Sequence, residues 1–191
     1  MGHREDLLAG ARRCLEKRGY ARTTARDLVA ESGTNLASIG YHFGSKEALL
    51  NEAIGESFQE WAERVRELAL AIEPGGEPMS VLAASWDAMH TSFAEYRGLA
   101  VAFTEALAQA ERQPALRAQL AAIYEETRAS VAAMISEAIG MPVDQARSLA
   151  AFQIVICDGL LVQWLLDPDA VPSGAELTAA LRLALGRTIE L

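Results

Sequence analysis

Residues 23–47 read TTARDLVAESGTNLASIGYHFGSKE, and these residues carry the clearest structural signals of the N-terminal part of the chain. Thr24, followed three residues later by Asp27, forms a capping box that predicts the start of a helix. Gly33 predicts the end of that helix, because the residue after a helix often needs a positive φ. Asn35 predicts the cap of a second short helix. Two short helices joined by a glycine-containing turn are typical of a helix-turn-helix.

The second short helix has a predicted outward face without charged side chains. Placing its residues at about 100° intervals turns Leu36, Ile39 and Phe43 toward the core. The outward face is then expected to carry Thr34, Ala37, Ser38 and Tyr41. An ordinary solvated helix carries Lys and Glu there, whereas small side chains let a helix lie deep in the major groove of DNA.

Two basic residues flank this helix in unusual places. Arg26 and Lys46 each fall in the first turn of a predicted helix, where the helix macrodipole disfavours a cation by up to about 1 kcal/mol. Alternatively, solvent screens this unfavourable interaction at the surface, and the position of the two side chains then indicates no function. We favour the interpretation that both side chains face backbone phosphates, because they flank the same short helix.

The rest of the chain also predicts helices, because apolar residues recur at helical spacing and β-branched runs are scarce. Proline and glycine clusters, of which residues 73–78 are the clearest, separate the segments. The expected fold is all-α with about nine helices. Their expected ranges are 7–19, 24–33, 35–41, 45–72, 79–95, 98–111, 114–139, 144–166 and 174–189.

Composition and charge narrow the class of protein. The net charge is −9, but residues 1–50 carry eight Lys+Arg and six Asp+Glu, whereas residues 51–191 carry nine and twenty. A mildly basic head and an acidic body fit a head that meets phosphate. There is no signal peptide and no uninterrupted apolar stretch of about 18 residues, so we expect a cytoplasmic protein that binds no membrane. Cys14 and Cys157 are expected to be buried thiols, and the isolated histidines predict neither a metal site nor a cofactor.

The run from Thr24 to Leu49, above all residues 41–47 (YHFGSKE), resembles the signature of the TetR family. The resemblance covers about the first 50 residues, and the body is similar to the family only in length and in helix count and order. It implies a three-helix DNA-binding domain at residues 1–48 and an all-helical ligand-binding and dimerisation domain at residues 49–191. One departure is Gly40, where many members of the family have Tyr.

The resemblance also implies a function and a set of contacts with double-stranded DNA. Members bind palindromic operators as homodimers, and a small-molecule effector usually releases them. Phosphate contacts are implied for Thr24, Tyr41, His42 and Lys46, and base or sugar contacts for Thr34, Asn35, Ala37 and Ser38. Arg26 matches a position that often touches DNA.

The body is expected to supply an effector pocket and a dimer interface. A mostly apolar pocket is expected from Trp86, Met89, His90, Phe93, Phe103, Tyr124 and Phe152, with His90 and Tyr124 able to form hydrogen bonds to the effector. Family dimers pair their last two long helices, which implies an interface at Ala151, Val155, Gly159, Val162, Leu177, Leu181 and Leu185.

Two other functions are alternatives to that of a ligand-responsive repressor. A DNA-binding dimer without a ligand response would differ only in lacking a true pocket. An all-α enzyme would need a clustered Asp motif or Glu-x-x-His pairs, and the sequence contains neither. The sequence leaves open whether the protein represses or activates transcription.

Overall fold

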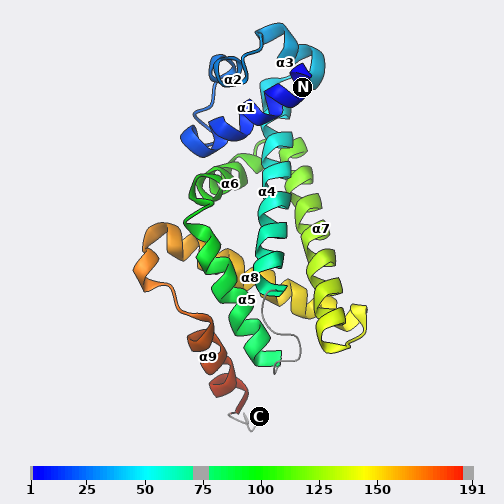
Figure 1. Ribbon diagram of the computed structural model, residues 1–191, viewed down its shortest axis with the longest axis vertical. Helices are drawn as coiled ribbons and strands as arrows, with labels where there is room; N and C mark the ends of the chain where they lie inside the picture. Colours follow the sequence, from blue (N-terminus) through cyan, green and yellow to red (C-terminus); the bar gives the residue numbers. More distant parts are fainter. Residues whose placement is uncertain (1, 71–77, 187–191) are drawn as a thin grey trace. The chain divides into compact units, whose positions relative to one another are not determined.

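The computed structural model describes residues 2–70 and 78–186, and every helix within them is drawn in Figure 1. This part of the chain contains no strand, which confirms the all-α prediction. The predicted break at residues 73–78 lies outside the described residues except for Pro78, where α5 begins. The helices are α1 (His3–Arg18), α2 (Ala25–Ser32), α3 (Leu36–Phe43), α4 (Lys46–Leu70), α5 (Pro78–Phe93), α6 (Arg97–Ala110), α7 (Pro114–Ile139), α8 (Val143–Leu166), the short 3-10 helix η1 (Pro168–Ala170) and α9 (Gly174–Gly186).

The chain folds into two compact units, and neither is one continuous segment. Unit 1 comprises Met1–Trp61 and Tyr96–Glu126, and unit 2 comprises Ala62–Glu95 and Thr127–Leu191. Helices α4 and α7 therefore each contribute to both units. The predicted boundary after residue 48 separates a DNA-binding part from a regulatory part, and it does not coincide with the boundary between the two compact units. The division into these two functional parts stays a prediction.

Helix α1 is the centre of unit 1, where it packs against α2 and α6 (Figure 1). Its buried side includes Leu7, Ala11 and Leu15, which recur at helical spacing. Two glycines allow the helices to approach closely. A methyl group at Gly10 would lie 2.8 Å from the Cβ of Ser32, and one at Gly98 of α6 would collide with the backbone of Glu16.

A buried hydrogen-bonded group joins α4 and α7 to the segment that follows α1. The hydroxyl of Tyr20 donates to Oδ1 of Asn51 on α4 at 2.5 Å, and Nε2 of Gln119 on α7 donates to the Asn51 carbonyl at 2.6 Å. Burial raises the pKa of Tyr20 to about 12. The phenol therefore stays neutral and continues to donate at neutral pH.

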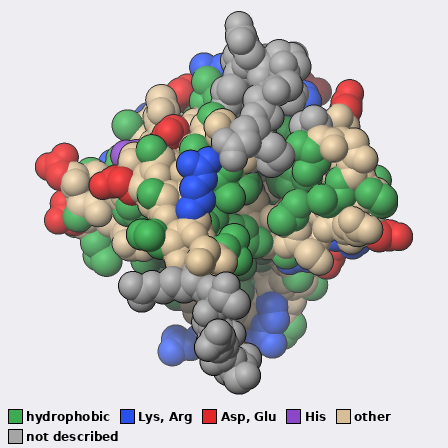
Figure 2. Space-filling model, turned by 90° about the horizontal axis from the view of Figure 1, so that it is seen from below, with side chains coloured by type: hydrophobic (Ala, Val, Ile, Leu, Met, Phe, Trp, Pro, Cys, Tyr) green, Lys and Arg blue, Asp and Glu red, His purple; other side chains and the backbone are tan. Residues whose placement is uncertain are grey.

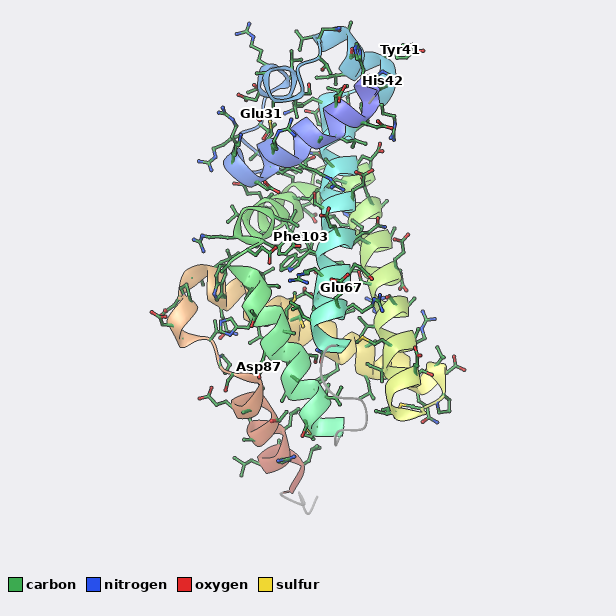
Figure 3. The ribbon with its side chains drawn as sticks, in the orientation of Figure 1. Glu31, Tyr41, His42, Glu67, Asp87 and Phe103 are labelled. Carbon is green, nitrogen blue, oxygen red and sulfur yellow. The ribbon has the colours of Figure 1, made fainter. Side chains whose placement is uncertain are left out.

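In unit 2, α5 packs against α8 and α9. Nε2 of Gln153 on α8 donates to Oγ of Ser85 at 2.7 Å, and the N–H of Gly174, where α9 begins, donates to Oδ1 of Asp87 at 2.7 Å. A side chain at Gly174 would collide with the backbone of Ala83. Figure 3 shows Asp87 on α5 beside the start of α9. The first residue of α9 is thus fixed against α5 both by contact and by a hydrogen bond.

Helix α8 is both long and apolar. By length and composition it could cross a membrane, and a third of its most apolar stretch is buried within the protein. This is weak evidence for a membrane span, because a core helix of a water-soluble protein has the same character. Gln153 and Asp158 interrupt its apolar run.

Candidate functional site

The start of α2 is fixed by a reciprocal pair of side chains. The N–H of Asp27 donates to Oγ1 of Thr24 at 3.2 Å, and the N–H and hydroxyl of Thr24 donate to the Asp27 carboxylate at 2.9 and 2.6 Å. The two hydrogen bonds that the carboxylate accepts from Thr24, and secondarily the charge of Arg18, lower the pKa of Asp27. The predicted capping box is confirmed.

The turn between α2 and α3 is built as the sequence predicts. Gly33 ends α2 in the left-handed conformation with φ of 68°, which favours glycine. Asn35 then caps α3, since its Oδ1 accepts from the Ser38 N–H at 3.0 Å. The hydroxyls of Ser32 and Thr34 lie 2.7 Å apart across the turn. The two helices and their turn form the predicted helix-turn-helix.

The exposed face of α3 differs from the predicted one. Leu36 was expected in the core but is 57% exposed, and Ser38 was expected to face outward but is only 8% exposed. Ala37, Gly40 and Tyr41 are exposed, and Tyr41 reaches 86%. Figure 3 shows Tyr41 pointing away from the ribbon. The outward face is therefore Leu36, Ala37, Gly40 and Tyr41, and it is largely apolar.

The first turn of α1 explains this difference. Oγ of Ser38 lies 3.3 Å from Nδ1 of His3 and also 3.3 Å from Oδ1 of Asn35. The guanidinium of Arg4 lies over the ring of Phe43, 5.3 Å from its centroid. α1 therefore covers the side of α3 that carries Ser38 and Phe43, and Leu36 is left outside.

Most basic side chains of the first 50 residues are neutralised by carboxylates. Six of the eight lie within ion-pair distance of Asp or Glu, namely Arg4, Arg12, Arg13, Lys17, Arg18 and Lys46. Among the described residues, no carboxylate lies within that distance of Arg22 or Arg26. Both are exposed, and Nε of Arg22 donates to the Arg18 carbonyl at 2.9 Å. These two arginines carry the uncompensated positive charge beside the helix-turn-helix.

The predicted DNA contacts fall into three groups by exposure. Thr24, Arg26, Asn35, Ala37 and Tyr41 are exposed, Thr34, His42 and Lys46 are half-buried, and Ser38 is buried. The ammonium of Lys46 donates to the Thr23 carbonyl at 3.1 Å and lies 3.4 Å from the Glu47 carboxylate. Arg22 was not among the predicted residues, because nothing in the sequence shows that it lacks a carboxylate partner.

The residues predicted for the effector pocket lie in both units. Phe103 and Tyr124 belong to unit 1, where their rings are 6.2 Å apart. Figure 3 labels Phe103 on α6. The other predicted residues, Trp86, Met89, His90, Phe93 and Phe152, belong to unit 2. In unit 2 the Trp86 and Phe152 rings lie 6.4 Å apart.

Two buried polar atoms of unit 2 have no partner among the described residues. They are Nε1 of Trp86, whose side chain is fully buried, and Oε1 of Gln153. An unsatisfied buried donor or acceptor costs about 1–3 kcal/mol, so a bound molecule that pairs with it recovers that cost. Gln153 was not among the predicted residues, since a glutamine in an apolar helix gives no sign of which helix it faces.

Three of the seven predicted dimer residues, Val155, Gly159 and Val162, lie on a largely exposed stripe of α8. Val155 is 66% exposed and Val162 50%, and they are joined at spacings of three to four residues by Phe152, Gly159 and Leu166. Ala151 is half-buried. On α9, Leu185 is exposed, whereas Leu177 and Leu181 are half-buried. Hydrophobic side chains also cover much of the face in Figure 2, with acidic side chains mostly at its edges.

Two family descriptions match the chain. "Bacterial regulatory proteins, tetR family" matches residues 7–53, and "BetI-type transcriptional repressor, C-terminal" matches residues 78–189, which is more than half of the chain. The chain belongs to the TetR family of bacterial transcriptional regulators. The resemblance seen in residues 24–49 is thereby confirmed, and the TetR family is one of regulators and not of enzymes.

Relatives within the TetR family match mainly the N-terminal part. The HTH-type transcriptional repressor AcnR of Corynebacterium efficiens is 39% identical over 67 residues, 35% of this chain and 36% of AcnR. The chain thus spans about a third of AcnR in that match. The HTH-type transcriptional regulator LmrA of Bacillus subtilis is 26% identical over 130 residues, 64% of this chain and 69% of LmrA.

Solved structures of TetR-like regulators share the fold over almost the whole chain. The transcriptional regulator SCO7518 from Streptomyces coelicolor A3(2) has a TM-score of 0.71 at 24% identity, covering 95% of this chain and 96% of that one. The multidrug binding protein EbrR, complexed with proflavin, has a TM-score of 0.67 at 22% identity, covering 98% and 100%. At these identities the likeness concerns the fold.

Proposed function

We propose that the protein is a DNA-binding transcriptional repressor that binds a palindromic operator as a homodimer and is released by a small-molecule effector. The observation that carries this proposal is a helix-turn-helix whose second helix has an exposed face, beside two arginines without carboxylate partners. The TetR family match supports it. The proposed location is the cytoplasm, where operators are found.

The proposed DNA contacts involve the residues predicted from the sequence, with Arg22 added, and with Tyr41 assigned to the exposed face of α3 rather than to a phosphate. Arg22 and Arg26 contact phosphates, because each offers a guanidinium that no carboxylate of the described chain neutralises. Lys46 gives up its hydrogen bond to the Thr23 carbonyl and contacts a phosphate instead. Ser38 acts through Asn35, which it helps to orient. The full proposed set is Arg22, Thr24, Arg26, Thr34, Asn35, Ala37, Ser38, Tyr41, His42 and Lys46.

The stripe on α8 is the proposed centre of the homodimer interface. An exposed apolar stripe of this length on one helix is costly in water unless a partner covers it. A methyl group added at Gly159 would meet no atom within 4 Å, so packing within the chain does not require glycine there. A second copy of the chain, with its α8 against this one, would use the space.

A small-molecule effector is proposed to bind in unit 2 between α5 and α8. The unpaired N–H of Trp86 and carbonyl of Gln153 support an effector with an apolar body, one hydrogen-bond acceptor and one donor. EbrR, a solved structural neighbour, is described as a multidrug binding protein and has been crystallised with imidazole and with proflavin. The alternative is a DNA-binding dimer without ligand response, which would bind its operator equally well in the presence of any such compound.

The proposed function is tested by fluorescence anisotropy on the DNA upstream of the protein's own gene, over a salt series. Wild type is expected to bind saturably at two or four chains per site. Arg26→Ala and Lys46→Ala should each weaken binding and reduce the salt slope by about one. Tyr41→Ala should weaken binding at every salt concentration.

Arg64→Ala is the matched control, because Arg64 is an exposed arginine of α4 that pairs with Glu67, outside the helix-turn-helix. It should leave both affinity and salt slope unchanged. If wild type binds neither this DNA nor any fragment selected from the genome better than random sequence, the proposed function is wrong.

A further inference from the structure

The exposed face of α3 carries none of the side chains that read guanine or adenine. It consists of Leu36, Ala37, Gly40 and Tyr41, and the Tyr41 hydroxyl is its only side-chain polar group. Guanine is read mostly by Arg or Lys, and adenine by both ends of an Asn or Gln amide. The one apolar group that a base presents in the major groove is the methyl group of thymine. We propose that α3 reads thymine methyl groups, so that each operator half-site places thymines opposite Leu36, Ala37 and Tyr41.

The polar residues next to this face are already engaged. Oδ1 of Asn35 accepts from both the N–H and the hydroxyl of Ser38, so it cannot also pair with adenine through both ends of its amide. The Ser38 hydroxyl is buried between Asn35 and His3. Asn35 then has only its Nδ2–H groups to offer to DNA, so it cannot read adenine in the bidentate way and the apolar contacts of α3 carry the sequence information.

Gly40 lets this face approach the bases. It lies inside α3, where glycine costs about 1 kcal/mol relative to alanine. A methyl group there would meet no atom of the chain within 4 Å, so no neighbour within the folded protein requires glycine. The missing side chain leaves a recess between Ala37 and Tyr41, where the edge of a base can lie against the helix backbone.

The two arginines without carboxylate partners have a different proposed role from the exposed face of α3. Arg22 lies just before α2 and Arg26 lies within it, and phosphate contacts position a protein without reading sequence. Affinity would come from these charges, and sequence preference from the methyl groups. This inference rests on the proposed function and adds the chemistry that the operator must present.

The test starts with selection of duplex DNA from a random library by the full-length protein. In the selected half-site, each thymine is replaced singly by uracil, which pairs with adenine identically but lacks the methyl group. Wild type should lose about four-fold in affinity for each methyl group that α3 contacts. Uracil in the flanking DNA should have no effect.

Variants assign the contact. Leu36→Ala should abolish the loss at one thymine and leave the other losses unchanged, and Tyr41→Ala should do so at a different one. Both residues are exposed, so the variants should fold as wild type does. Gly40→Leu should weaken binding to the selected site at least ten-fold. Arg26→Ala should bind more weakly throughout and keep the full sensitivity to uracil.

The outcomes separate two failures. If no sequence is enriched, the proposed function itself fails. If a site is enriched but its half-sites lack thymine, or if uracil leaves the affinity of wild type unchanged, α3 does not read methyl groups. If Leu36→Ala and Tyr41→Ala remain as sensitive to uracil as wild type, the methyl groups are read by residues outside this face, and the inference is likewise overturned.

Discussion

Gly40 is a residue at which stability and function are expected to oppose each other. Its Cβ position is open, and it lies within a helix. Gly40→Ala should therefore raise the free energy of unfolding by about 0.5–1 kcal/mol, because alanine loses less backbone entropy on folding. Urea unfolding monitored by circular dichroism measures this change.

Gly10→Ala is the matched control for Gly40→Ala, because both glycines are helical. At Gly10 the added methyl group would overlap Ser32 of α2. This variant should lower the free energy of unfolding by about 1–3 kcal/mol. A Gly40→Ala variant less stable than wild type would contradict the open environment assigned to this position.

Tyr20 is expected to make stability depend on alkaline pH. Its pKa is raised from 10.0 to about 12, so its contribution to stability is complete below pH 10 and is lost as the pH rises through about 12. Tyr20→Phe should cost about 1–2 kcal/mol at neutral pH, because Oδ1 of Asn51 loses its donor. Urea unfolding of both proteins at neutral and alkaline pH checks this.

The informative result for Tyr20 is the difference between the two proteins. The gap in unfolding free energy between wild type and Tyr20→Phe should shrink between pH 10 and about 12. A gap that stays constant over this range would mean that the Tyr20 phenol does not ionise with the shifted pKa.

The surface of α3 shows which residue properties the sequence leaves undetermined. A wheel of α3 alone places Leu36 with Ile39 and Phe43, and Ile39 is indeed buried. The orientation of the helix is set by His3 and Arg4, more than 30 positions earlier in the chain, which cover Ser38 and Phe43. Local periodicity contains no information about such a distant neighbour.

At the level of the element, the cap of α2 is expected to be acid-sensitive. The hydrogen bonds from Thr24 lower the pKa of Asp27 below its ordinary value of 3.8. The carboxylate therefore contributes stability above that value, and the contribution is lost as the pH falls through the lowered pKa. Asp27→Asn should destabilise the protein at neutral pH and make a smaller difference in acid, once the pH has fallen below the lowered pKa of Asp27.

Urea unfolding at the two pH values measures this effect for α2. Glu176→Gln provides a second case, because Glu176 accepts from Ser173 before α9 in the same way and its pKa is also lowered. An Asp27→Asn variant as stable as wild type at neutral pH would show that the capping box does not stabilise α2.

The extents of the helices were predictable because their signals are local. Capping boxes, prolines and glycines act within four residues, and the observed bounds fall within about two residues of the expected ones for α2, α3, α6 and α8. Helix pairing is not local. Phe103 and Trp86 are both buried aromatic residues, yet they belong to different compact units, and no local signal around either residue distinguishes the two.

For the whole molecule, the stripe on α8 predicts a homodimer that one charge can disrupt. Val155 is exposed at its centre, so Val155→Glu should place two carboxylates in the proposed interface. Size-exclusion chromatography with light scattering should give the mass of two chains for wild type and of one chain for Val155→Glu. The melting temperature of wild type should rise with concentration.

Leu107→Glu serves as the control for the dimer, because Leu107 is an exposed leucine of α6 outside the stripe. It should keep the mass of two chains. A wild-type protein with the mass of one chain, or a Val155→Glu variant with that of two, would place the interface elsewhere or remove it.

The close helix contacts at glycine carry a consequence for how this protein's descendants can diverge. Gly10, Gly98 and Gly174 each lie where any larger residue would strike a neighbouring helix, whatever the protein binds. Gly40 and Gly159 have no such neighbour within the chain. After a gene duplication, the first three should therefore be inherited unchanged in both copies. Gly40 should be free to change when one copy acquires a new operator. Gly159 should be free to change when the products of the two copies no longer form dimers with each other.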